Sequence, residues 1–171
     1  MPRFSRRATA PVVKGGYRSY RLFVREDFAG QCAYCLLSEI MAGGEENFEL
    51  DHFRPKSRFK KLVNDFYNIY YSCHPCNHQK RDAWPVPELE AKGVLIADLC
   101  TDEFRTHFLV KADGTWEGKT ETGAYTIKVL RLNRKHLITI RQILADAGYA
   151  IHEVRVDEDE LRRLLGPPDK A

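Results

Sequence analysis

Two identical cysteine pairs constrain this chain more than any other feature of its sequence. They are Cys32-Ala-Tyr-Cys35 and Cys73-His-Pro-Cys76. Each C-x-x-C knuckle turns both sulfurs towards one point, and two knuckles in one small domain indicate a tetrahedral Zn²⁺ held by four thiolates. Four thiolates close the coordination shell, so we expect a structural zinc that contributes directly to folding. The fifth cysteine, Cys100, is expected to be an inert core thiol.

The composition agrees with a small globular protein. The chain has 171 residues, of which 43% are hydrophobic and 30% are charged, and this length suits one domain with a modest core. It contains neither an apolar run long enough to span a bilayer nor the apolar segment of a secretory signal. We therefore expect a cytoplasmic protein with no membrane partner, and in that compartment a disulfide framework is not expected.

Charge is distributed unevenly. The first 25 residues carry seven Lys and Arg side chains and no acidic one. Such asymmetry favours a polyanionic partner on this side of the molecule, and an equally good interpretation is a solvated, partly disordered basic arm.

The segment between the knuckles alternates in the manner of two strands. Residues 48–53 form the first expected strand, which ends at Arg54-Pro55, and residues 68–72 form the second. A short helix is expected from Pro75 onwards. The fold class is thus α+β, with a ββα unit joined to a zinc knuckle.

The C-terminal half predicts a hairpin and helices. Asp113-Gly114 is a strong hairpin turn between short apolar runs. Residues 124–147 have the apolar periodicity of one or two helices, broken or bent near Leu132-Asn133, and residues 156–168 suggest a short charged helix followed by a frayed end. We divide the chain into a basic arm or helix (1–28), a zinc-stapled core (29–84) and an extension that packs on the core (85–171).

The stretches LDHFRPKS, DFYNIYYSC and CHPCNHQK together resemble the HNH endonuclease motif of the His-Me finger superfamily, in its four-cysteine zinc form. The resemblance covers residues 32–81. It implies a ββα-metal core and hydrolysis of DNA phosphodiesters, with RNA as the second choice of substrate. The chemistry needs a base for the attacking water and a divalent cation, Mg²⁺ or Mn²⁺, to neutralise charge at the phosphate.

The resemblance assigns roles to four polar residues. Asp51 and Asn77 would supply the oxygen ligands of the cation. His52 would be the general base, because an imidazole titrates near neutral pH. Asn68 would tie the loop backbone and help to orient the His52 ring. A simpler reading of Asn77 is a helix cap.

Basic side chains near the motif are candidates for nucleic-acid binding. Arg54, Lys56 and Arg58 follow the first strand and would contact backbone phosphates, although a polar loop explains them as well. Lys80 and Arg81 lie on the short helix and would bind the phosphate beside the cut.

The second half is loosely similar to bacterial HNH proteins of anti-phage systems, the Septu-type and retron-linked nucleases. The matching elements are HF-DG-W, T-x-x-G and LRLNRKHLITIR. This similarity implies a defence nuclease that works with an AAA-type ATPase partner. One ββα site cuts one strand, so a double-strand break would need a homodimer or two successive nicks. The alternative function is a non-catalytic zinc-ribbon adaptor, which would have no need for an Asp-His pair opposite Asn77.

Overall fold

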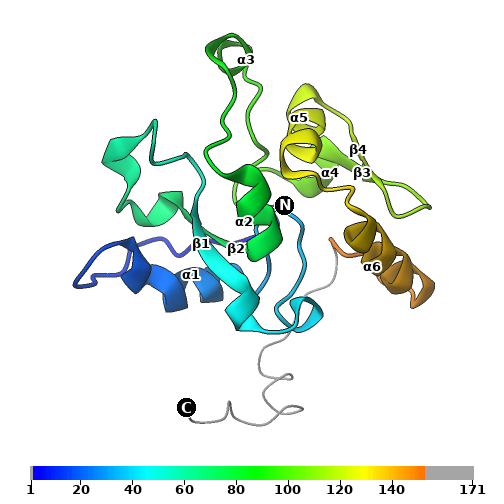
Figure 1. Cartoon of the computed structure of the whole chain (residues 1–171), viewed down its shortest axis with the longest axis horizontal. Helices are drawn as coiled ribbons and strands as arrows, with labels where there is room; N and C mark the ends of the chain where they lie inside the picture. The colour runs from blue at the N-terminus through cyan, green and yellow to red at the C-terminus, as the bar shows by residue number, and fades with distance from the viewer. Residues whose placement is uncertain (1, 153–171) are drawn as a thin grey trace.

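The structure is a computed structural model that describes residues 2–152. A strand–strand–helix unit lies at its centre, made of β1 (Phe48–His52), β2 (Ile69–Cys73) and α2 (His74–Lys80) (Figure 1). The two strands are antiparallel, with Phe48 opposite Cys73 and His52 opposite Ile69. Every residue of β2 is buried, since β1, α1 and α2 all contact it. The expected α+β class is confirmed.

The loop that joins the strands carries two short 3₁₀ turns, η4 (Lys60–Leu62) and η5 (Phe66–Asn68). Asp65 begins the second turn, because its carboxylate accepts a hydrogen bond from the backbone N–H of Tyr67 at 2.9 Å. Helix α2 begins directly after Cys73 and has Pro75 in its first turn, where a proline costs no hydrogen bond. The second knuckle therefore joins strand and helix with no intervening loop.

The N-terminal segment packs on the central unit through η1 (Tyr17–Tyr20) and α1 (Arg21–Asp27). Arg6 donates to the carbonyls of Phe66 at 2.7 Å and Ile69 at 3.0 Å, and pairs with Asp27 at 3.1 Å. This part of the chain is thus held against the core, and Arg6 and Arg7 form internal contacts that neither interpretation of the basic segment predicted. The turns η2 (Ile40–Ala42) and η3 (Glu45–Asn47) complete the loop before β1.

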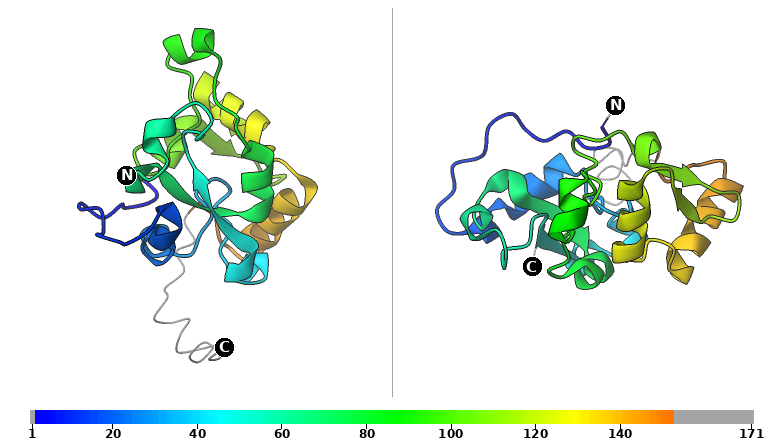
Figure 2. Two further views of the ribbon diagram at one scale, coloured as in Figure 1. Left: turned by 60° about the vertical axis from the view of Figure 1, so that its left-hand side comes forward. Right: turned by 90° about the horizontal axis from the view of Figure 1, so that it is seen from above.

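The C-terminal elements lie on the other side of the central unit from α1 (Figures 1 and 2), except α3 (Pro87–Ala91), which projects at the top of Figure 1. The others are α4 (Phe104–His107), β3 (Phe108–Val110), β4 (Trp116–Gly118), α5 (Glu121–Leu130) and α6 (Lys135–Asp146). The expected hairpin is confirmed: β3 and β4 pair antiparallel, and Gly114 adopts a φ of +78° in the turn. The two helices and the break between them are confirmed as well, and Arg131 ends α5 in the left-handed conformation. The helix expected in residues 156–168 lies outside the described residues.

The hairpin and the two helices share one small core. Phe104, Phe108 and Trp116 form an aromatic cluster with ring centroids 4.9–5.3 Å apart. The guanidinium of Arg141 lies 4.1 Å from the Trp116 ring centroid and donates to the carbonyl of Leu132 at 2.8 Å. Burial lowers the pKa of Arg141 to about 10. None of the helices within residues 2–152 is long and apolar enough to cross a membrane.

Candidate functional site: a cysteine cluster beside a polar cavity

The four knuckle cysteines form one buried cluster in which every sulfur lies within 4.8 Å of the others. Cys32 and Cys35 come from the turn after α1, Cys73 ends β2, and Cys76 lies in the first turn of α2. The backbone N–H of Ala33 donates to the carbonyl of Tyr71 at 2.8 Å, which fixes the first knuckle beside the second. Four buried thiols at this spacing could bind zinc.

The electrostatics of the cluster favour charge on one sulfur, that of Cys32, because the pKa values of Cys35 and Cys73 are raised by their neighbouring thiols and by burial. Burial alone would raise the pKa of Cys32, but hydrogen bonds from the other three cysteines lower it well below its usual value. A guanidinium nitrogen of Arg134 also lies 3.2 Å from the sulfur of Cys76. By contrast, burial raises the pKa of Cys100 to about 12, which agrees with an inert thiol outside the cluster.

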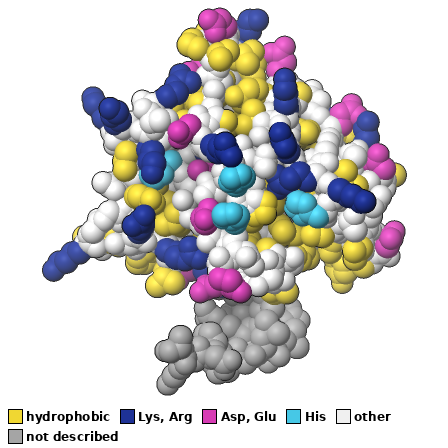
Figure 3. Space-filling model, viewed as in Figure 1, with side chains coloured by type: hydrophobic (Ala, Val, Ile, Leu, Met, Phe, Trp, Pro, Cys, Tyr) yellow, Lys and Arg dark blue, Asp and Glu magenta, His cyan; other side chains and the backbone are white. Residues whose placement is uncertain are grey.

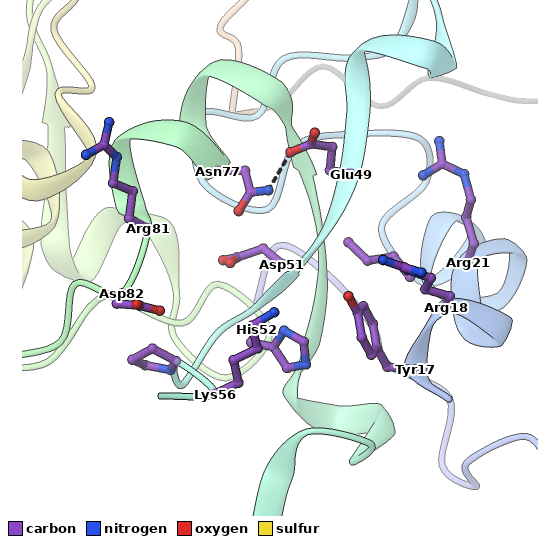
Figure 4. A pocket seen from close by; sticks show the side chains of 12 residues that line it. Tyr17, Arg18, Arg21, Glu49, Asp51, His52, Lys56, Asn77, Arg81 and Asp82 are labelled. Carbon is purple, nitrogen blue, oxygen red and sulfur yellow. Dashed lines mark hydrogen bonds between the residues drawn. The ribbon is translucent and has the colours of Figure 1, made fainter. Parts of the chain in front are cut away.

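A polar cavity of about 550 Å³ opens beside the cluster, between β1, α2 and the N-terminal segment (Figure 4). Three of the residues predicted for catalysis, Asp51, His52 and Asn77, line it together. The remaining lining residues are Tyr17, Arg18, Arg21, Glu49, Leu50, Pro55, Lys56, Arg81 and Asp82. Strand β1 supplies Glu49, Asp51 and His52, α2 and the residues after it supply Asn77, Arg81 and Asp82, and η1 and α1 supply the far wall.

Asp51 is almost fully buried at the back of this cavity, with 6% of its surface exposed. Its Oδ2 accepts hydrogen bonds from the hydroxyl of Tyr34 and from Nζ of Lys80, the latter at 2.9 Å. Burial raises the pKa of the Asp51 carboxyl, while Lys80 and Tyr34 act in the opposite direction.

His52 is held in a single orientation by the loop between the strands. Its Nε2 lies 2.9 Å from the carbonyl oxygen of Val63, and Tyr17 packs edge-on against the ring with centroids 4.6 Å apart. Asn68 holds the same loop: its Oδ1 accepts from the N–H of Arg54 at 2.9 Å, and its Nδ2 donates to the carbonyl of Leu62 at 3.2 Å. An Nε2–H that donates to a carbonyl leaves Nδ1 as the acceptor nitrogen.

Asn77 is oriented by Glu49, a residue that the sequence interpretation did not select. The amide Nδ2 of Asn77 donates to one oxygen of Glu49 (Figure 4). His74 Nδ1 lies 3.0 Å from the other oxygen. Partial burial would raise the pKa of Glu49, but the hydrogen bonds from Asn77 and His74 lower it. The amide oxygen of Asn77 is then the atom left for another partner. Asn77 forms no cap at the start of α2, where Cys73 is the N-cap residue.

The five basic residues predicted for nucleic-acid binding occupy three different environments. Lys56 and Arg81 line the cavity and are exposed. Arg54 and Arg58 are exposed but outside the lining, beside the ring of Phe59. Lys80 is fully buried, and its Nζ also donates to the carbonyl of His52 at 2.7 Å.

Arg18 and Arg21 bring two further positive charges to the opposite wall of the cavity. The sequence signalled them only as members of the basic N-terminal segment. On the face of the molecule seen in Figure 3, Lys and Arg side chains are spread around a central group of histidines. A cavity with acidic groups at its base and cations at its rim suits a phosphate-containing ligand.

Comparison with known proteins gives one informative relative. No family model matches the chain. The chain is 27% identical over 143 residues to the Septu protein PtuA of Bacillus mycoides (strain KBAB4), an alignment that covers 70% of this chain and 20% of the relative. The chain thus spans about a fifth of the length of that protein.

Proposed function

We propose that this protein is a metal-dependent HNH endonuclease that hydrolyses DNA phosphodiester bonds. The observation that carries the proposal is the meeting of Asp51, His52 and Asn77 in one cavity beside a cluster of four cysteines. The order β1, β2, α2 agrees with the ββα unit of the His-Me finger nucleases. An adaptor that only binds nucleic acid would not need Asp51, His52 and Asn77 to line the same cavity.

In this proposal His52 takes the proton of the attacking water on Nδ1. Its Nε2 is turned towards the Val63 carbonyl, so the ring is fixed in the tautomer that leaves Nδ1 free to accept. Asn68 acts on His52 indirectly, because it holds Leu62 and thereby the neighbouring carbonyl of Val63.

Asp51 and Asn77 would hold the catalytic cation. One carboxylate oxygen of Asp51 is engaged by Tyr34 and Lys80, and the amide nitrogen of Asn77 is engaged by Glu49, so each side chain keeps one oxygen for the cation. Carboxylate and amide oxygens are ligands that Mg²⁺ and Mn²⁺ prefer. When bound, the cation supplies charge neutralisation at the phosphate and stabilisation of the leaving oxygen. The small number of protein donors leaves room for water and for phosphate oxygens.

The proposed phosphate contacts are Lys56 and Arg81 on one wall and Arg18 and Arg21 on the other. Arg54 and Arg58 flank Lys56 on the same loop, outside the cavity lining, where they would contact phosphates farther from the cut. Lys80 takes a different role from the one first assigned to it, since its ammonium group faces Asp51 inside the protein.

The four cysteines would hold one structural Zn²⁺, which fixes the start of α2 and hence Asn77. Residues 29–84 would be the nuclease core, with residues 1–28 as one wall of its cavity and residues 85–171 as a supporting extension. The loose resemblance of the second half to Septu-type nucleases and the similarity to a Septu protein both support a role in anti-phage defence. A partner ATPase belongs to the same proposal.

The test is plasmid cleavage in Mg²⁺ or Mn²⁺ by wild type, His52→Ala and the control His136→Ala. His136 is exposed on α6, outside the cavity lining. We expect His52→Ala to lower the rate about 10²–10⁴-fold at equal zinc content, and the control to cut as wild type does. Equal cutting by wild type and His52→Ala would reject the assigned base. Binding of DNA without cutting by any of them would favour the zinc-ribbon adaptor.

A further inference from the structure

Only one of the two oxygens of the Asp51 carboxylate is hydrogen-bonded to the described part of the protein. Tyr34 and Lys80 both donate to Oδ2, whereas no residue in the described part of the chain donates to Oδ1. Two donors on one oxygen restrict rotation of the carboxylate about the Cβ–Cγ bond, because rotation moves Oδ2 out of its position between them. The oxygen that remains free belongs to a residue that lines the cavity.

Both donors are linked to the cysteine knuckles, one within a knuckle and one on the helix that a knuckle begins. Tyr34 lies between Cys32 and Cys35, and its side chain is buried with 3% of the residue exposed. Lys80 follows Cys76 by four residues on α2, so the two side chains share one face of the helix. Cys76 and Lys80 are both fully buried. Each knuckle therefore contributes one donor to the same carboxylate oxygen.

We infer that Tyr34 and Lys80 are positioning residues for Asp51. The cysteine cluster fixes the two donors, the donors fix the orientation of the Asp51 carboxylate, and Oδ1 is thereby held as a single ligand for a divalent cation. The inference rests on the proposed function, because it takes Asp51 to be a cation ligand. Mg²⁺ demands near-ideal octahedral geometry, so a carboxylate that can rotate is a poorer ligand. Partners that orient a metal ligand contribute about 10–100-fold to metal affinity or activity.

Tyr34→Phe is the sharpest variant, because it removes one oxygen atom and keeps the ring that stacks on Tyr70. Tyr71→Phe is its matched control. The hydroxyl of Tyr71 also donates to a buried carboxylate, that of Glu39, and neither residue lines the cavity. Both variants thus lose the same kind of hydrogen bond, and only one of these bonds reaches Asp51.

The experiment measures Mn²⁺ binding to the zinc-loaded full chain by electron paramagnetic resonance. It is done with and without a duplex oligonucleotide, in a His52→Ala background that prevents turnover. We expect Tyr34→Phe to weaken Mn²⁺ binding about ten-fold, with zinc content and melting temperature close to those of Tyr71→Phe. Tyr71→Phe should keep the Mn²⁺ affinity of its parent. In the His52-containing protein, Tyr34→Phe should raise the Mn²⁺ concentration that half-saturates cleavage by the same factor.

Three results would overturn the inference. The first is parental Mn²⁺ affinity in Tyr34→Phe. The second is loss of zinc from Tyr34→Phe alone, which would mean that the hydroxyl supports the knuckle and not the cation ligand. The third is absence of Mn²⁺ binding by the parent, with or without DNA, which would remove the cation site itself. Mn²⁺ binding that is weakened by Tyr34→Phe in a protein that cuts no DNA would sustain the inference and reject only the nuclease assignment.

Discussion

The two halves of the molecule differ in the kinds of side chain that make up their small cores. Around β1, β2 and α2, the aromatic core is joined by the buried cysteine cluster and by buried polar contacts such as that between Lys80 and Asp51. In the C-terminal half, α5, α6 and the β3–β4 hairpin close over aromatic and aliphatic side chains, with Trp116 and Leu130 buried at the centre. From this comparison we expect the half that carries the cavity to depend on metal and charge in addition to its apolar core, while the other half depends on apolar packing.

The largest expected effect comes from removing a zinc ligand. Cys73→Ser, or chelation of the wild type, should abolish cooperative folding of the β1–β2–α2 unit, because structural zinc in small domains contributes on the order of 10 kcal/mol. The measurement is thermal unfolding followed by near-UV circular dichroism, with zinc content determined in parallel. Cys100→Ser is the control, since Cys100 lies outside the cluster. A Cys73→Ser protein with the wild-type melting curve would show that the four cysteines do not hold a structural metal.

The second prediction concerns a substitution in the core of the apolar, C-terminal half. Leu130 is fully buried on α5, so Leu130→Ala should lower the free energy of unfolding by about 3 kcal/mol. Leu109→Ala, at a half-exposed site on β3, should change it by no more than about 0.5 kcal/mol. Both are measured by urea denaturation at fixed zinc.

We expect Leu130→Ala to keep its zinc and its cleavage rate per folded molecule. Parallel loss of zinc would mean instead that the two halves fold as one unit. That outcome would erase the distinction between a metal-dependent half and an apolar half, since damage to either would then release the metal.

The sequence predicted the features that depend on local spacing. The knuckles, both strands, the hairpin turn and the break between α5 and α6 all follow from neighbouring residues, and the structure contains each of them. Two features of the cavity could also have been read from periodicity. Glu49 and Asp51 lie two residues apart on β1 and therefore share one face of the strand. Asn77 and Arg81 lie four residues apart and share one face of α2, and Cys76 and Lys80 share another face in the same way.

The burial of Lys80, which the sequence analysis did not predict, has a physical origin in the same periodicity. A knuckle cysteine must face the interior, and the side chain four residues later faces the same way. Lys80 is therefore buried, whereas Arg81 reaches the cavity. The contributions of Tyr34, Arg18 and Arg21 could not be predicted in the same way, because they depend on how α1 and the first knuckle pack against β1.

Arg134 tests whether the two halves are independent, and its expected effect is the smallest. It precedes α6, donates to the carbonyl of Leu130 at 2.6 Å and reaches across to the sulfur of Cys76 at 3.2 Å. A zinc held by four thiolates carries a net negative charge, which a guanidinium at this distance partly neutralises. Arg134→Ala should therefore release zinc about ten-fold faster to a chelator, measured with a colorimetric zinc indicator.

Lys128→Ala is the control for Arg134→Ala, because it removes a positive charge from an exposed site on α5. The control should release zinc at the wild-type rate. If both variants behave as wild type, the C-terminal half supports the cysteine cluster only by covering it. If Arg134→Ala alone releases zinc faster than the wild type does, the apolar half supplies a positive charge that the metal-dependent half lacks. The C-terminal extension is then part of the zinc site as well as its cover.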